Sequence, residues 1–86
     1  MKVQRREATD VLTWDGETAV LMGETALRLS ELSAVIYALT EDPVEIGRLA
    51  RELESRFGVP EGSSSLDSTR EAVAELVRRG VLKATP

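Results

Sequence analysis

The sequence predicts an α+β fold of winged helix-turn-helix-like type, in which a three-stranded antiparallel sheet is followed by three helices. Short strand-like segments alternate with tight-turn dipeptides between residues 11 and 29. Apolar residues then recur at helical spacing in three further segments. So small a sheet needs a helical layer to cover one of its faces.

The predicted sheet is a meander of strand-like segments joined by tight turns. Residues that favour strands, such as Val11 and Trp14, lie ahead of Asp15-Gly16, a dipeptide typical of two-residue hairpin turns. A second turn is predicted at Gly23-Glu24. The predicted strands are residues 11–14, 18–22 and 25–29.

The last of these segments predicts a strand with one buried and one exposed face. Leu27 and Leu29 alternate with Ala26 and Arg28, the period-2 pattern of a strand that packs on a core from one side. Residues 1–7 are polar, and we expect them to be frayed.

The first predicted helix follows the third strand directly. Ser30 is a suitable N-cap because its hydroxyl can accept a hydrogen bond from the first turn. Thr40-Glu41 ends the segment. The predicted buried face consists of residues at 3–4 spacing, namely Leu32, Val35, Ile36 and Leu39.

The second predicted helix has the clearest start signal in the chain. Asp42 is a suitable cap, Pro43 fits the first turn, and Glu45 follows the cap by three residues. Gly58 lies where a left-handed C-terminal cap belongs. The predicted inner face of this second helix consists of Ile46, Leu49, Ala50, Leu53 and Phe57.

A loop rich in small and polar residues, 59–65, precedes the third predicted helix. This helix is expected to begin between Leu66 and Ser68 and to be capped by Gly80, with Val81-Leu82 as a hydrophobic close. Its predicted inner face consists of Leu66, Thr69, Val73, Leu76 and Val77. The whole chain, residues 1–86, is expected to form one domain with its core between about residues 10 and 82.

The composition restricts the classes of function. A net charge of −4 and a pI of about 4.8 give no electrostatic footprint for nucleic acid or an anionic membrane. Cysteine and histidine are both absent, which excludes disulfides and thiolate metal sites and removes the commonest general base. We therefore expect no metal, no cofactor and no enzymatic activity. Without an apolar run that could span a bilayer or act as a secretory signal, the expected location is the cytoplasm.

Three segments follow one another in the chain: "LRLSELSAVIYAL", a capped helix ending "RFGVP", and a last helix ending "LVRRGVL". In this order they resemble the PqqD-like family of RiPP recognition elements. The resemblance covers about residues 10–82. The chain departs from the family pattern at Ser30, where asparagine is usual, and at Tyr37, where tryptophan is usual. The loop and start of the third helix, 63–69, depart as well.

This resemblance implies a peptide-binding function. Such domains hold the leader segment of a ribosomally synthesised precursor peptide, so that a separate leader peptidase, cyclase or radical-SAM enzyme can act on the rest. The leader lies as an added strand on the third strand, beside the third helix, by β-augmentation. Lasso-peptide clusters are the first expectation, and radical-SAM clusters of the quinone-cofactor type are the second.

The residues themselves are compatible with this expectation. An edge strand has unpaired backbone groups that attract another strand, and a stripe on the third helix is apolar in its middle and basic at its ends. The stripe residues are equally well explained as core and solvated flanks. An open edge also permits a strand-swapped dimer in place of a monomer. The predicted peptide-binding residues are Thr25, Ala26, Leu27, Arg28, Leu29, Arg70, Val73, Ala74, Val77 and Arg78.

Two other functions remain open from the sequence. A winged helix-turn-helix DNA-binding regulator is disfavoured because residues 66–80 hold three acids and three bases, which gives the recognition helix no excess of positive charge. A protein–protein adaptor that covers the same strand edge is equally compatible with the pattern. Trp14 is expected to pack on the first strand, and Tyr37 is expected in the core with its hydroxyl at the rim.

Overall fold

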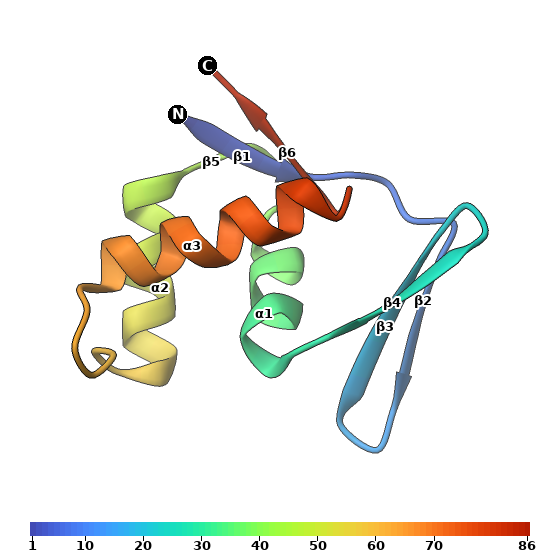
Figure 1. Ribbon diagram of the computed structural model, residues 1–86, viewed down its shortest axis with the longest axis horizontal. Helices are drawn as coiled ribbons and strands as arrows, with labels where there is room; N and C mark the ends of the chain where they lie inside the picture. Colours follow the sequence, from blue (N-terminus) through green and yellow to red (C-terminus); the bar gives the residue numbers. More distant parts are fainter.

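The computed structural model describes residues 1–86 and contains two antiparallel sheets and three helices (Figure 1). The α+β prediction is confirmed, but a second sheet is present that the sequence did not predict. One sheet has the strand order β2-β3-β4 and the other β5-β1-β6. The elements are β1 (Lys2–Arg5), β2 (Asp10–Trp14), β3 (Glu17–Met22), β4 (Thr25–Leu29), α1 (Glu31–Leu39), β5 (Val44–Glu45), α2 (Ile46–Phe57), α3 (Ser65–Arg78) and β6 (Leu82–Thr85).

The β2-β3-β4 sheet is the predicted meander. Asp15 and Gly16 both have positive φ values, 47° and 76°, as a type I′ turn requires. Gly23 has a positive φ and Glu24 does not, the combination of a type II′ turn. Both turns match the twist of their flanking strands, which explains why the dipeptide signals located them correctly.

The N-terminus forms the middle strand of the second sheet, so the prediction of a frayed terminus is wrong. Strand β1 pairs with β6 from Lys2 opposite Thr85 to Arg5 opposite Leu82, and its other side pairs with β5. Val3 is completely buried. A terminal segment remains ordered when its backbone and an apolar side chain are both tied down, and here both are.

Helix α1 starts as predicted. The Ser30 hydroxyl accepts a hydrogen bond from the Ser33 backbone N–H, 3.1 Å away. Strand β4 ends at the buried Leu29, and the next residue, Ser30, is the N-cap of α1. This junction fixes the direction in which β4 leaves the helical layer.

Helix α2 begins later than predicted. Val44 and Glu45 are extended as β5, and Val44 lies opposite Val3 in β1. The N-cap is therefore Glu45, whose carboxylate accepts a hydrogen bond from the Gly47 N–H, 2.8 Å away. Asp42 and Pro43 do not start the helix, because the strand pairing keeps the next two residues out of helical geometry. Gly58 ends α2 with a positive φ, as predicted.

Helix α3 is capped by Ser64, whose hydroxyl accepts a hydrogen bond from the Asp67 N–H. It begins at Ser65, slightly earlier than predicted, and Gly80 follows it with a positive φ. Thr69, Val73 and Leu76 are buried along its inner face as predicted.

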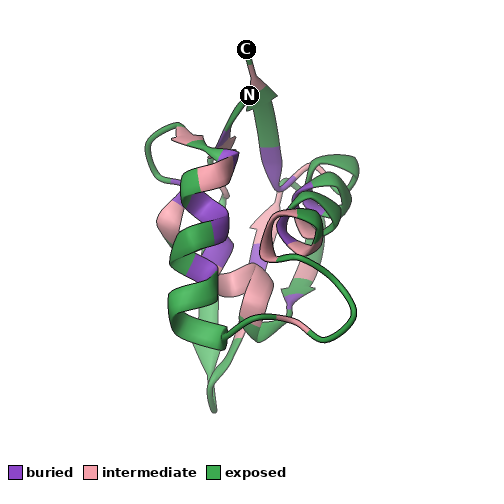
Figure 2. Ribbon diagram, turned by 90° about the vertical axis from the view of Figure 1, so that its left-hand side faces the viewer, coloured by how far each residue is buried: buried purple, intermediate pink, exposed green.

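One apolar core connects the helices with both sheets. Val20 and Leu29 enter it from the meander, and Val3 and Leu82 enter it from the second sheet. The buried residues of α2 lie on the side of the helix that is turned toward α3 (Figure 2). Phe57, predicted for this inner face, is 44% exposed because it lies at the last position of α2, beyond the buried stripe. No helix is both long and apolar enough to cross a membrane.

Candidate functional site

Strand β4 has one unpaired edge. It pairs with β3 on one side and with no strand on the other. In a hairpin with a two-residue turn, the flanking pair Met22–Thr25 is hydrogen-bonded, and every second pair along the ladder is not. Ala26 and Arg28 therefore direct their N–H and C=O groups away from β3. Each of these two residues can exchange a pair of hydrogen bonds with an added strand.

The opposite edge of the same sheet, on β2, is partly occupied. By the same alternation Val11 and Thr13 direct their backbone groups outward. The Val11 N–H, however, donates to the Asp10 carboxylate at 2.8 Å. A side chain that takes an edge N–H blunts that edge toward other strands. No side chain accepts a hydrogen bond from Ala26 or Arg28, so β4 is the more open edge.

The side chains of β4 divide between two faces as predicted. Leu29 is buried and Leu27 packs against the core, whereas Ala26 and Arg28 are exposed. The inward pair anchors the strand on the helical layer through α1. Thr25, the first residue of β4, is exposed beside the turn.

Arg28 lies across the exposed face of the meander. Its guanidinium is 3.6 Å from the Glu17 carboxylate and 6.0 Å from the centre of the Trp14 ring. Trp14 lies on the first strand of the meander, where it is 42% exposed beside Arg28 and outside the core. The alternation of β2 explains this position, because Trp14 shares its face with the exposed Leu12, and the core-facing positions of the sheet are held by β3 and β4.

The residues of the predicted stripe on α3 differ in their exposure. Val73 is 3% exposed and belongs to the core, and its part in peptide binding stays a prediction. Val77 is 37% exposed, and Arg70 and Ala74 are exposed as well. Arg78 is exposed and pairs with Glu75 at 2.6 Å. The stripe therefore presents one apolar side chain of useful size, together with cations at its two ends.

The two predicted halves of the site stay apart in the free domain. Strand β4 packs against β3 and α1, whereas α3 packs mainly against α2 and β6. None of the four main cavities is lined by residues of both β4 and α3. Figure 1 shows the meander and α2 on opposite sides of α1, while α3 runs from beside α2 across α1 in this view.

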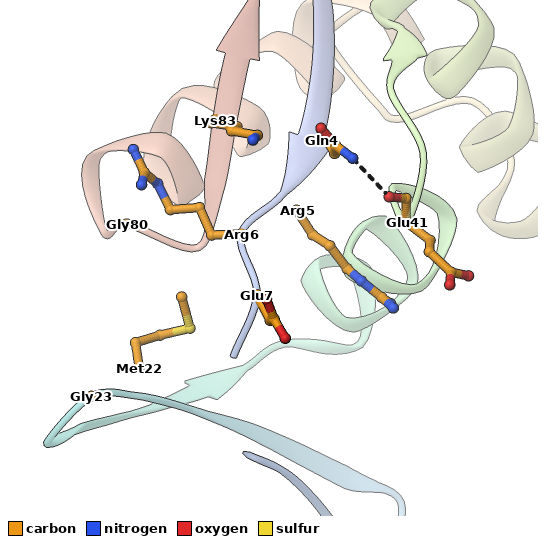
Figure 3. A pocket seen from close by; sticks show the side chains of 9 residues that line it. All are labelled: Gln4, Arg5, Arg6, Glu7, Met22, Gly23, Glu41, Gly80 and Lys83. Atoms are coloured by element: carbon orange, nitrogen blue, oxygen red, sulfur yellow. Dashed lines mark hydrogen bonds between the residues drawn. The ribbon is translucent and has the colours of Figure 1, made fainter. Parts of the chain in front are cut away.

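An open cavity of about 820 Å³ lies where the β3–β4 turn approaches the end of α3 (Figure 3). We call it the basic cavity. Its lining includes Arg5, Arg6, Lys83, Met22, Gly23 and Gly80. Sequence reasoning missed it because it assigned the two arginines to a frayed terminus, and no local pattern places that terminus beside residue 80.

Tyr37 holds the segment that lines this cavity. Its ring is buried, its hydroxyl donates to the Arg6 carbonyl at 3.2 Å, and the Arg5 guanidinium lies 4.9 Å from the ring centre. The prediction of a core tyrosine with its hydroxyl at the rim is confirmed. The linker between β1 and β2 is thereby fixed on α1.

No group of three or more His, Cys, Asp or Glu side chains is placed to hold a metal ion. Comparisons of the chain with family models, curated proteins and solved structures found no match. The candidate site is therefore defined by its geometry alone, as the free edge of β4 with the basic cavity at its beginning.

Proposed function

We propose that this domain binds the leader segment of a ribosomally synthesised precursor peptide by strand addition to β4 and presents it to a separate maturation enzyme. The observation that carries the proposal is the free edge of β4, with outward backbone groups at Ala26 and Arg28. The resemblance of the helical segments to RiPP recognition elements supports the class of ligand. In this proposal the fold is a variant of the winged helix, with the meander in the place of the wing.

The anchoring of β4 supports the proposal energetically. Leu29 is buried and Ser30 caps α1 immediately after it, so the strand is ordered before a peptide arrives. An added strand then loses its own conformational freedom but requires little ordering of the domain. Each backbone hydrogen bond contributes about 0.5–1.5 kcal/mol net, and side chains facing the domain add specificity.

The experiment titrates a fluorescent leader peptide, synthesised from the short reading frame that we expect beside this gene, into the domain. Ala26→Pro removes one outward N–H, and the proline ring faces solvent on an edge, where it is tolerated. We expect at least a tenfold rise in Kd, about 1.4 kcal/mol. Thr13→Pro is the matched control, because it removes the equivalent N–H from the opposite edge on β2.

Two outcomes would decide the proposal. Loss of binding with Ala26→Pro but not with Thr13→Pro, at unchanged circular dichroism, supports strand addition to β4. Equal binding by both variants and the parent protein refutes it. The contribution of α3 is tested separately by Val77→Asp, for which we expect a further loss of at least tenfold if the peptide reaches that helix.

A further inference from the structure

We infer that Arg6 and Lys83 recognise an acidic side chain of the bound peptide, just C-terminal to the part of the peptide that pairs with β4. The inference rests on the proposed strand addition and adds a charge requirement to it. It is carried by the position of the basic cavity, by the unpaired state of its cations, and by the direction of β4.

Both cations project from fixed backbone. The Arg6 N–H donates to the Val81 carbonyl at 2.8 Å, and the Arg6 carbonyl accepts from the Tyr37 hydroxyl. Lys83 lies in β6 opposite Gln4 of β1. Because the backbone is held on both sides of the cavity, only side-chain freedom is lost when the two cations close on an anion.

The three cations that line the cavity differ in whether they already have a partner. Arg5 is engaged by the Tyr37 ring and donates to the Tyr37 carbonyl. Arg6 and Lys83 form no ion pair. Figure 3 shows the Arg6 guanidinium on the Gly80 side of the cavity and the Lys83 ammonium on the Gln4 side, with the carboxylates of Glu7 and Glu41 farther from both. In a chain of net charge −4, the part of the cavity between Arg6 and Lys83 is a local positive site, and a carboxylate is the anion that a peptide supplies.

The direction of β4 sets where the acid falls in the peptide. The strand starts at Thr25, next to Met22 and Gly23 in the cavity wall, and runs away from the cavity. All pairs in this sheet are antiparallel, and antiparallel pairing is the more stable kind. An added antiparallel strand therefore reaches the cavity with its C-terminal end. Gly23 in the cavity wall precedes Ala26 by three positions, so at about 3.3 Å per residue we expect the acid about two to four residues after the one opposite Ala26.

The test uses peptides that bind the protein, selected from a phage-displayed library of random peptides. We expect selected sequences that lose binding to Ala26→Pro to carry Asp or Glu at the predicted spacing. For a fluorescent peptide of this kind, replacing the acid by its amide should raise Kd by about three- to tenfold. Arg6→Glu with Lys83→Glu should raise it at least as much, and 0.5 M salt should reduce the effect.

Two further arms keep the outcomes distinct. A peptide with lysine in place of the acid should regain affinity for the Arg6→Glu, Lys83→Glu protein and not for the parent. Arg51→Glu, a charge reversal on α2, should leave Kd unchanged, since Arg51 is an exposed residue of α2 that does not line the basic cavity.

The inference is overturned if binding still depends on Ala26 but neither the peptide acid nor the two cations affect Kd. It is also overturned if the enriched acid lies N-terminal to the pairing segment, or if random duplex DNA displaces the peptide more effectively than an acidic peptide does. If binding is unchanged by Ala26→Pro, the failure belongs to the proposed function instead.

Discussion

Strand β1 offers a quantitative test of the second sheet. Val3 has no exposed surface and lies in the middle strand, between β5 and β6. Val3→Ala removes two methyl groups at about 0.8 kcal/mol each, which gives about 1.6 kcal/mol. The cavity left behind adds to this loss, so we expect a decrease of about 1.5–3 kcal/mol in the free energy of unfolding.

This loss is large for a domain of 86 residues, because such domains are stabilised by only about 5–15 kcal/mol in total. At about 4–8 °C per kcal/mol, the melting temperature should fall by roughly 10 °C. The assay is urea unfolding followed by far-ultraviolet circular dichroism, with Lys2→Ala as the control on an exposed position of the same strand. A Val3→Ala protein within about 0.5 kcal/mol of the parent would mean that the terminus is frayed after all.

Two further predictions concern the junction between β4 and the helical layer. Ser30→Ala removes the N-cap of α1 and should lower the free energy of unfolding by about 1 kcal/mol; Ser55→Ala on the exposed side of α2 should not lower it, and equal urea midpoints for the two would contradict the capping role. Tyr37→Phe removes the hydrogen bond to the Arg6 carbonyl and should cost about 0.5–1.5 kcal/mol in the same assay, whereas an unchanged midpoint would show that the linker is held by other contacts.

Much of the candidate site was accessible from the sequence because its signals are local. The alternation from Thr25 to Leu29 separated the inward leucines from the outward Ala26 and Arg28, and the structure agrees. The stripe on α3 was less well predicted. Helical spacing placed Val73 and Val77 on one inner face, but only Val73 is buried, whereas Val77 is 37% exposed.

The start of α2 shows how a tertiary contact overrides a local signal. Asp42, Pro43 and Glu45 form a strong capping pattern within four residues, yet the pairing of Val44 with Val3 draws this segment into β5. Glu45 is the N-cap in place of Asp42, because its carboxylate accepts a hydrogen bond from the Gly47 N–H. A sequence pattern of a few residues contains no information on a pairing partner such as Val3, which is 41 residues away from Val44.

By itself, the sequence determined the meander, its two turns, the three helices and the outward side of β4. These features depend on interactions within a few residues, such as turn dihedrals, caps and the period of apolar positions. Only the tertiary structure decided that the chain ends form a second sheet, because Lys2 and Thr85 pair across 83 positions. That pairing brings Arg6 and Lys83 to the beginning of β4, and so the basic cavity exists only in the folded chain.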